Sequence, residues 1–308
     1  MSGNIDFSAR VAIVTGAASG IGRAIALALA ARGARVLTND LSGADDVARA
    51  IRSAGGEATA DSTPVGDFDA ARDIVAHALA AYGRIDMLIN SAGISAPGAF
   101  TDVGERAILR VLQVNLIGAL ALTQAAWPTM QAAGYGRILN IASNAALGMG
   151  YSAAYAASKG GLIALTKDNA REGAAFGIKA NAMLPVASTT MTVKIPPGMF
   201  RDWIDTHFPP QKIAAPALFL LSEAMPASGE IFSCGGGRIA RTAYLNTQGY
   251  FNTEATPESV ADHFDAVMDT ASAVLVENQP QELNRYTAWL PWPETGGMPG
   301  IAGNRSIA

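Results

Sequence analysis

Short runs of β-branched residues alternate with longer Ala- and Leu-rich segments along most of this chain. This alternation is typical of a parallel sheet covered by helices on both faces, because parallel strands need a crossover connection. The predicted strands are Val11–Thr15, Val36–Asn39, Glu57–Val65, Met87–Asn90, Ile138–Ser143, Ile178–Leu184 and Ile231–Ser233. The predicted helices are Gly22–Ala31, Asp45–Ala54, Ala70–Tyr82, Glu105–Met130, Ala154–Phe176 and Ile213–Ser222. We therefore expect an α/β fold with a doubly wound parallel sheet of the Rossmann type.

The pattern predicts one domain with an appended segment. Residues 1–248 form the expected catalytic domain, in which the Pro-, Thr- and Met-rich stretch 185–212 has no clear period and is predicted to be an irregular substrate lid. Residues 249–308 form a C-terminal extension, expected to pack on the same domain or on a partner subunit. Thr256-Pro257-Glu258 predicts the start of a helix that runs to about Met268. A turn-rich arm is predicted from Pro291.

Composition excludes several classes of protein. Half of the residues are hydrophobic and 16% are charged, against about 25% charged in an average soluble chain. A large core is expected, disorder is excluded, and self-association as a homodimer or homotetramer is predicted. The net charge is −4 and no run of Lys or Arg is present, so no nucleic-acid partner is expected.

The sequence shows no evident membrane span, signal peptide or metal-binding motif. No apolar run approaches the roughly 18 residues of a membrane span, and Met1–Arg10 lacks the apolar region of a signal peptide. A cytoplasmic location without membrane association is therefore expected. The single cysteine, Cys234, cannot form an internal disulfide. The three histidines, His77, His207 and His263, do not have metal-binding spacing, and no metal is predicted.

A glycine-rich turn, Thr15–Gly22, connects the first predicted strand to the first predicted helix. Glycines allow a tight turn and close approach to a pyrophosphate, and the helix N-terminus offers free N–H groups. The turn lacks the Gly-Lys-Ser/Thr ending of a P-loop. The glycines alone also fit a strand–helix turn without a ligand, but their position favours a dinucleotide.

Asp40 closes the second predicted strand, about eighteen residues beyond Gly22. An acidic residue at this position reaches the adenosine ribose, where its carboxylate accepts hydrogen bonds from the hydroxyls. It would repel a 2′-phosphate, and Leu41-Ser42-Gly43 supplies no compensating cation. The sequence therefore predicts NAD as the cofactor. Without the glycine turn, Asp40 would be interpreted as a solvated loop acid.

Tyr155 and Lys159 are four residues apart, which places both side chains on one face of the predicted helix. A tyrosine phenol has an ordinary pKa of about 10 and is a poor base at neutral pH. A neighbouring ammonium and the cationic ring of an oxidised nicotinamide are expected to lower the pKa of Tyr155. The pair is either an acid/base for a hydroxyl proton or an ordinary surface pair.

Two further polar residues are candidates for the site. Ser143 ends a predicted strand at the edge of the sheet where ligands bind, so it either bonds a substrate oxygen or caps the following turn. Asn115 interrupts an apolar helix, where it either serves a proton relay or satisfies buried backbone groups. The residues leave both alternatives open.

Together these motifs resemble the short-chain dehydrogenase/reductase family. The match covers roughly residues 7 to 237 and comprises Thr15–Gly22, Asn90-Ser91-Ala92-Gly93, Asn115, Ser143, Tyr155-x-x-x-Lys159 and Asn181-x-x-x-Pro185. The resemblance implies that Tyr155 is the acid/base, that Lys159 lowers its pKa and holds the nicotinamide ribose, that Ser143 orients the substrate and that Asn115 anchors a water chain. It places Asn90, Ala92 and Gly93 beside the adenosine ribose and Val65 near the adenine.

A closer resemblance is to the (3R)-hydroxyacyl-CoA dehydrogenase part of peroxisomal multifunctional enzymes of type 2. It is carried by Asn39-Asp40-Leu41, Ala126-Trp127-Pro128, Tyr135-Gly136-Arg137-Ile138 and Thr256-Pro257-Glu258. Three features depart from the family pattern: the loop Asn144–Ala154 is one residue short, Ser91 replaces an asparagine, and Val186 follows Pro185 where many members have glycine. The short loop weakens the assignment of Ser143 most.

The predicted function is an NAD(H)-dependent oxidoreductase that interconverts a secondary alcohol and a ketone. The predicted cofactor-binding residues are Gly16, Ser19, Gly20, Ile21, Gly22, Asp40, Val65, Asn90, Ala92, Gly93, Tyr155, Lys159, Pro185, Val186, Ser188 and Thr190. The leading substrates are 3-hydroxyacyl-CoA and hydroxysteroid compounds. The lid candidates for an apolar substrate are Met191, Met199, Phe200, Trp203 and Phe208, and those for coenzyme A phosphates are Lys194, Arg201 and Lys212. A carbonyl reductase for small cyclic or aryl ketones and a non-catalytic dinucleotide-binding protein are the alternatives.

Overall fold

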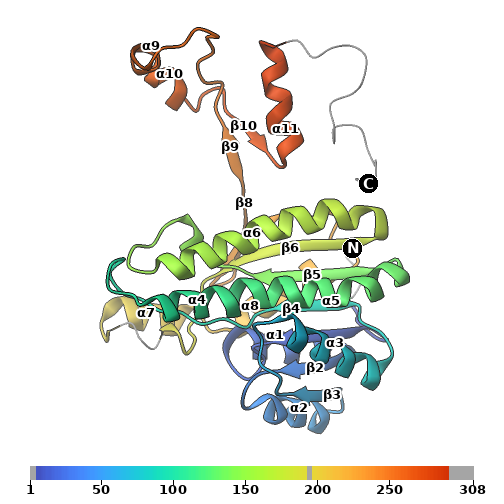
Figure 1. Ribbon diagram of the computed structural model, residues 1–308. Coiled ribbons are helices and arrows are strands. Elements are labelled where there is room, and N and C mark those ends of the chain that lie inside the picture. Colours follow the sequence, from blue (N-terminus) through green and yellow to red (C-terminus); the bar gives the residue numbers. More distant parts are fainter. Residues whose placement is uncertain (1–4, 193–195, 291–308) are drawn as a thin grey trace. The chain divides into compact units, whose positions relative to one another are not determined.

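The computed structural model describes residues 5–192 and 196–290, and the chain divides into two compact units, Met1–Arg241 and Thr242–Ala308 (Figure 1). The division after residue 241 lies near the predicted boundary after residue 248. The predicted arm from Pro291 lies outside the described residues.

The first unit is built on an eight-stranded sheet with the order β3-β2-β1-β4-β5-β6-β7-β8. Its strands are β1 (Val11–Thr15), β2 (Arg35–Asn39), β3 (Glu57–Asp61), β4 (Met87–Asn90), β5 (Gly136–Ile141), β6 (Ile178–Pro185), β7 (Ile231–Gly235) and β8 (Arg238–Thr242). Strands β1 to β7 pair in parallel. The strand order reverses between β1 and β4, and a reversal of this kind opens a ligand crevice at the carboxyl ends of the strands.

Helices cover both faces of this sheet (Figure 1). They are α1 (Gly20–Ala30), α2 (Ala44–Ser53), α3 (Phe68–Tyr82), α4 (Glu105–Leu112), α5 (Gly118–Ala133), α6 (Ala153–Gly173), α7 (Met199–His207) and α8 (Gln211–Leu221). Helices α1, α2 and α8 share one hydrophobic core with the sheet, and α3 and α5 share another with its opposite face.

Strand β1 shows why the sheet is covered on both sides. Val11 and Ile13 pack in the core beneath α3 and α5, whereas Ala12 and Val14 pack beneath α1, α2 and α8. Side chains alternate between the two faces of a strand, so a strand buried on both faces is an uninterrupted apolar run. The predicted doubly wound parallel α/β fold is confirmed.

Two predicted segments, the third strand and the lid, differ from the structure. Strand β3 ends at Asp61 and does not continue to Val65, because the Asp61 carboxylate accepts the Thr63 N–H at 2.9 Å and turns the chain. The prediction of an irregular lid over 185–212 is wrong where α7 forms. This helix buries Ile204 and pairs Arg201 with Asp205 one turn later, at 2.6 Å.

The long predicted helix Glu105–Met130 is interrupted and longer than expected. Helices α4 and α5 are joined by a π-helical turn, Gln113–Ile117, and α5 continues past Pro128 to end at Gly134, whose φ of +60° suits glycine. The stretch Glu105–Ala133 is long and apolar enough to cross a membrane by length and composition alone. Core helices of globular proteins pass the same test, and here α5 packs on α3 and the sheet.

The second unit contains short elements. They are β9 (Tyr244–Asn246), β10 (Val274–Val276), α9 (Pro257–Asp262), α10 (Phe264–Met268) and α11 (Gln279–Asn284), and β9 pairs antiparallel with β10. Thr256 caps α9 in a capping box with Ser259, as the helix-start pattern predicts. The single helix predicted to about Met268 is wrong, because the chain breaks at His263, which contacts the Ser259 carbonyl at 2.7 Å and stacks on Tyr250.

Candidate active site

A cavity of about 880 Å³ lies at the carboxyl ends of the strands of the first unit. Its walls come from the glycine turn, from the segments after β2, β3, β4, β5 and β6, and from α4 and α7. The predicted site residues that line it are Gly16, Ser19, Gly20, Ile21, Gly22, Asp40, Val65, Ala92, Gly93, Ser143, Tyr155, Lys159, Pro185, Val186 and Thr190. The fold therefore brings together residues from seven separate segments of the sequence.

The glycine turn presents bare backbone to this cavity. Gly16 and Gly20 have φ angles of +64° and +53°, which side chains other than glycine rarely adopt. A Cβ on Gly22 would lie 2.2 Å from the Gly16 carbonyl oxygen, so the turn closes only with glycine there. Ser19 does not cap α1 and the first turn holds no acidic residue, which leaves the helix N-terminus suited to an anionic group.

Asp40 lies beside this turn, where one carboxylate oxygen accepts the Ala18 N–H at 3.1 Å. Among the described residues that line the cavity, Asp40 is the one acid, and Arg110 and Lys159 are the cations. The cradle of positive-φ glycines, the uncapped helix end and the acid fit a dinucleotide with free ribose hydroxyls.

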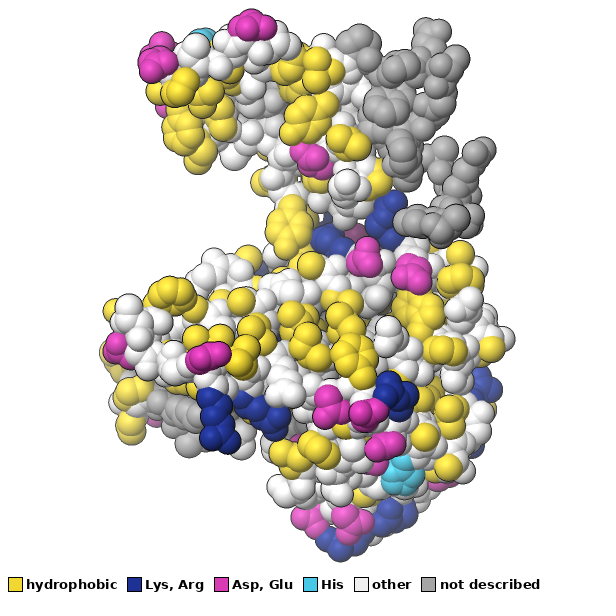
Figure 2. All heavy atoms as spheres, in the orientation of Figure 1, with side chains coloured by type: hydrophobic (Ala, Val, Ile, Leu, Met, Phe, Trp, Pro, Cys, Tyr) yellow, Lys and Arg dark blue, Asp and Glu magenta, His cyan; other side chains and the backbone are white. Residues whose placement is uncertain are grey.

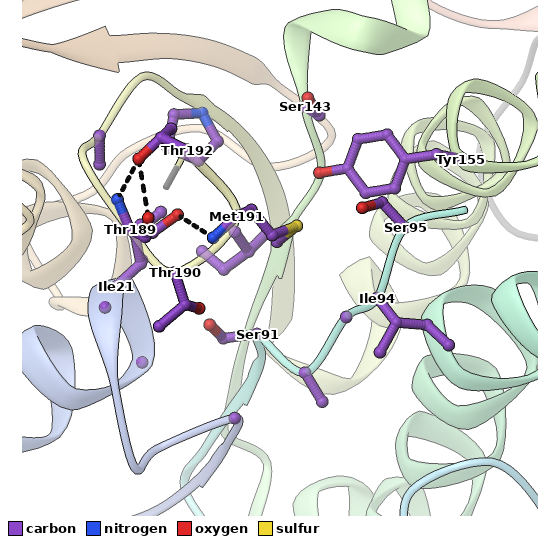
Figure 3. Close-up of a pocket in the computed structure, with 18 of the residues that line it drawn as sticks. Ile21, Ser91, Ile94, Ser95, Ser143, Tyr155, Thr189, Thr190, Met191 and Thr192 are labelled. Carbon is purple, nitrogen blue, oxygen red and sulfur yellow. Dashed lines mark hydrogen bonds between the residues drawn. The ribbon is translucent and has the colours of Figure 1, made fainter. Parts of the chain in front are cut away.

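Tyr155 projects from α6 into the cavity, and its hydroxyl points toward the end of β5, where Ser143 lies (Figure 3). Burial raises the pKa of Tyr155 above its ordinary range, and the neighbouring Ser143 hydroxyl acts in the opposite direction. The phenol is therefore protonated at neutral pH in the chain without ligands. In that state it can donate a proton to a ligand oxygen.

Lys159 lies one turn beyond Tyr155 on α6 and is buried. Its Nζ donates a hydrogen bond to the Ile141 carbonyl at 2.6 Å and lies 5.7 Å from the centroid of the Tyr155 ring. Burial lowers the pKa of Lys159 to about 8. Burial is the largest effect on the Tyr155 phenol and holds its pKa above the ordinary range, so a lowering of that pKa by Lys159 stays a prediction.

Ser143 caps the turn that follows it, which is one of its two predicted roles. It also lies at the cavity, where the other role, a bond to a substrate oxygen, requires it. Its Oγ accepts the Ala145 N–H at 3.1 Å and so caps the turn that follows β5. The same hydroxyl lines the cavity near Tyr155, where it donates a long hydrogen bond of 3.5 Å to the neighbouring Asn144 Oδ1. The short loop before Tyr155 has therefore not moved Ser143 away from the cavity.

Asn115 supports the cavity wall from behind. It lies in the π-helical turn, is buried, and does not line the cavity. Its side chain holds both backbone groups of Ile94, accepting the N–H at 2.8 Å and donating to the carbonyl at 2.9 Å, and it donates to Ser158 Oγ at 3.0 Å. The structure thus shows the alternative in which Asn115 satisfies buried backbone groups.

Two predicted cofactor contacts point elsewhere. The Asn90 amide donates to Asn140 at 2.8 Å and to Thr123 at 3.3 Å, which ties β4 to β5 and α5 inside the core. The Ser188 hydroxyl bonds Asp205 of α7. Neither residue lines the cavity, and each bonds a protein partner instead.

The residues predicted for the substrate lid also divide into those that line the cavity and those that do not. Met191 and Phe200 line the cavity, whereas Met199 is exposed and Trp203 packs edge-on against Phe208 at 4.6 Å. Of the proposed cations, Arg201 pairs with Asp205, and Lys212 donates to the His207 carbonyl at 3.1 Å. Lys194 lies outside the described residues.

Several lining residues were not predicted. They include Ser91, Ile94, Ser95, Pro97, Arg110, Asn144, Met149, Ser152, Thr189 and Ile204. The segment from Ser91 to Pro97 follows a strand at the ligand edge, and that position was a signal for it. The three histidines form no metal site with acids or Cys234, and the described part of the chain holds no group of three or more metal-binding side chains.

Comparison with known proteins gives a consistent result. The sequence model of the short chain dehydrogenase family matches residues 10–198. A peroxisomal hydratase-dehydrogenase-epimerase of Saccharomyces cerevisiae is 34% identical in an alignment that covers 93% of this chain and 33% of that one. A cis-4-hydroxycyclohexanecarboxylate dehydrogenase of Sinomonas cyclohexanicum is 39% identical, over 76% of this chain and 98% of that one. The chain thus spans about a third of the length of the yeast relative.

Solved structures share the fold. Full-length peroxisomal multifunctional enzyme type 2 of Drosophila melanogaster matches with a TM-score of 0.79 and 29% identity, over 93% of this chain and 50% of that one. A dehydrogenase from Beutenbergia cavernae with NADP bound at low occupancy matches with a TM-score of 0.71 and 36% identity, over 76% of this chain and 98% of that one. The predicted resemblances, to the family and to the type 2 enzymes, are confirmed.

Proposed function

Because the chain belongs to the short-chain dehydrogenase family, whose members are oxidoreductases that use a nicotinamide dinucleotide, we propose that it interconverts a secondary alcohol and a ketone with NAD(H). The observation that carries this proposal is the cavity itself. It holds the Tyr155 phenol, the Ser143 hydroxyl and the buried Lys159 ammonium on one wall and the uncapped glycine turn on another. A site that only binds a dinucleotide has no need of a buried phenol beside a serine hydroxyl.

The choice of NAD over NADP rests on Asp40. Its carboxylate stands beside the glycine turn, where it would accept hydrogen bonds from ribose hydroxyls and repel a 2′-phosphate. The relative from Beutenbergia cavernae has NADP bound, so the preference needs its own test. We expect Asp40→Ser to lower the ratio of kcat/KM for NAD to that for NADP by about tenfold. The exposed acid Asp45, exchanged in the same way, serves as the control, and an unchanged ratio in Asp40→Ser would remove Asp40 from the argument.

The chain's own part in the chemistry is proton transfer and positioning. When bound, the nicotinamide supplies or accepts the hydride. In the reducing direction the protonated Tyr155 hydroxyl donates its proton to the ketone oxygen, and the Ser143 hydroxyl donates a hydrogen bond to the same oxygen. In the oxidising direction Tyr155 must lose its proton first, and its burial makes that step unfavourable at neutral pH.

Lys159 keeps a positive charge behind the reacting groups. Its Nζ is fixed by the Ile141 carbonyl, so the charge stays close to Tyr155 and favours any phenolate that forms. A Cβ added to Gly93 would meet Asn115 Oδ1 at 3.4 Å and Lys159 Nζ at 3.5 Å, so these two groups approach the same point. We assign Asn115 a positioning role, in which it holds the Ile94 backbone and thereby that point of the wall.

The substrate class proposed is a 3-hydroxyacyl-CoA or a hydroxysteroid, with small cyclic or aryl ketones as the alternative. Apolar side chains at the α7 end of the cavity, Met149, Met191, Phe200 and Ile204, suit a lipid-like substrate. The yeast relative is named as a dehydrogenase within a multifunctional enzyme, which supports the first class. The Sinomonas relative acts on a hydroxycyclohexane carboxylate, which supports the alternative.

Replacing Tyr155 by Phe tests the proposed mechanism. The variant removes the proton donor and keeps the ring, so the rate of NADH consumption with a panel of ketones should fall at least about 10³-fold. Tyr151→Phe is the matched control, because Tyr151 is exposed on the same segment and does not line the cavity. Equal rates for the wild type and Tyr155→Phe would favour the remaining alternative, a non-catalytic dinucleotide-binding protein.

Two further expectations accompany this function. We propose a homodimer or homotetramer, because the fraction of hydrophobic residues is high, and light scattering of the purified chain measures the mass directly. We also propose a cytoplasmic location, which imaging of a fluorescent fusion tests. No nucleic-acid or membrane partner is proposed.

A further inference from the structure

Ser95 is a second hydroxyl of the cavity wall that the proposed mechanism does not use. It lies in the segment after β4, five residues beyond the strand end at Asn90, and it lines the cavity. In the view of Figure 3 its side chain is drawn next to the Tyr155 ring, on the side opposite Ser143, and all three residues line the cavity. Two serine hydroxyls from different segments thus share the cavity wall with the proton donor.

The position of Ser95 is held by its neighbours. Asn115 bonds both the N–H and the carbonyl of Ile94, the preceding residue. Three residues after Ser95, the Gly98 N–H donates to the Tyr151 carbonyl at 2.9 Å. The segment is therefore tied to the π-helical turn on one side and to the start of α6 on the other. A side chain between two such ties is preorganised for a ligand.

The Ser95 hydroxyl has no hydrogen-bond partner among the described residues of the chain. It does not contribute to the shifted pKa of Tyr155, to which Ser143 does contribute, so the two serines are not equivalent. The cavity wall to which Ser95 belongs also carries the apolar side chains of Ile94, Pro97 and Met191. A donor on an apolar wall loses its hydration when a ligand enters, and the loss is compensated only if the ligand brings an acceptor.

We propose that Ser95 donates a hydrogen bond to a second oxygen of the substrate, carried within two carbons of the carbon that reacts. This inference rests on the proposed function, because it takes the reacting oxygen to lie between Tyr155 and Ser143. The substrates it selects are 3-oxoacyl and 3-hydroxyacyl esters and thioesters, which carry a carbonyl two carbons from the reacting one. Simple ketones and monohydroxy compounds lack this acceptor and leave the Ser95 hydroxyl unpaired.

A matched pair of substrates tests the proposal with the full chain. Ethyl acetoacetate and 2-heptanone have the same chain length and a ketone at the same position, but only the first carries the ester oxygens. Reduction of each by NADH is followed by absorbance for the wild type, Ser95→Ala and Ser95→Thr. We expect Ser95→Ala to lower kcat/KM for ethyl acetoacetate about tenfold and that for 2-heptanone less than about twofold. Ser95→Thr retains the donor and should retain the preference.

Ser91→Ala is the control, since Ser91 lines the cavity on the side of the glycine turn, and it should change both substrates alike. An equal loss with both ketones in Ser95→Ala, or no loss with either, would overturn the role of Ser95 and leave the proposed function intact. Turnover of neither ketone by the wild type would instead contradict the proposed function.

Discussion

The two units of this chain differ in how they bury apolar side chains. In the first unit β1 is buried along its whole length, and large side chains such as Ile13 and Leu88 are completely buried. In the second unit Pro280 is the one buried residue of the described range 242–290, and both strands are largely exposed. Figure 2 shows hydrophobic side chains on the surface of this unit. Leu245, Phe264 and Leu275 are among its exposed hydrophobic residues.

This difference separates two sources of stability. Burial of apolar surface is the main stabilising contribution in a folded domain, at about 25 cal/mol per Å². The first unit obtains that contribution within its own sequence. The second unit relies on local devices, such as the Thr256 capping box and the hydrogen bonds of Thr247 to Val267 and Arg285, each worth about 1 kcal/mol. Only the first unit has the rigid frame that a catalytic site needs.

The largest expected effect comes from replacing Lys159, the buried cation that lines the cavity of the first unit. Lys159→Met should lower kcat at least about 10³-fold, because it removes the charge beside Tyr155. The same change should raise the free energy of unfolding at pH 7 by about 1–3 kcal/mol, because the wild type buries an ammonium whose pKa is lowered to about 8. Assay of NADH oxidation and urea denaturation measure the two effects, with Lys167→Met on the same helix as the control.

The pH dependence of this stability difference has a definite sign. The unfolded chain binds the Lys159 proton up to its ordinary pKa of 10.5, and the folded chain binds it only up to about 8. The wild type therefore gains stability relative to Lys159→Met as the pH rises from about 8 to 10.5. A difference that does not change over this range would contradict burial as the cause.

A pair of leucine substitutions compares the two units directly. Leu88→Ala in β4 removes a completely buried side chain and should lower the free energy of unfolding by about 2–5 kcal/mol. Leu275→Ala in β10 removes a side chain that is 48% exposed and should cost less than about 0.5 kcal/mol. Urea denaturation followed by circular dichroism measures both. Equal costs would mean that the second unit has a core of its own.

Separating the units extends this comparison. Residues 1–241 alone should remain folded, with a Tm within about 5 °C of the whole chain, since their core lies within them. Residues 242–308 alone should show no cooperative thermal transition, because Pro280 is the one buried residue in the described part of this piece, 242–290. Differential scanning calorimetry on the two pieces distinguishes these outcomes. Unfolding of the first piece would show that the extension stabilises it.

The smallest expected effect is on the pH profile. Above pH 8 the buried Lys159 loses its proton, so kcat for ketone reduction should fall about tenfold between pH 7 and pH 9. The second unit offers the contrast, because the lowered pKa of Glu258 comes from hydrogen bonds at the exposed helix start. Glu258→Gln should leave the profile unchanged. A flat profile in the wild type would exclude Lys159 as the titrating group.

Much of the fold and of the site could be predicted from the sequence. The strands, the glycine turn, Asp40 and the Tyr155–Lys159 spacing depend on residues close together in the chain, and local periodicity reports them well. The breaks were harder to foresee. The π-helical turn contains Asn115, whose side chain bonds the distant backbone of Ile94. Strand β3 ends at Asp61, whose side chain bonds the nearby backbone of Thr63. In both places a side chain competes with the regular backbone hydrogen bonds.

The sequence by itself determined the order of the elements, the turn at the carboxyl end of β1 and the presence of a phenol and an ammonium on one helix face. Only the tertiary structure decided that Asn115 holds Ile94, that Ser95 and Tyr155 line the same cavity, and that burial raises the pKa of that phenol. These properties arise from contacts between residues far apart in the chain and from the removal of water around them. Neither is encoded in any local pattern of residues.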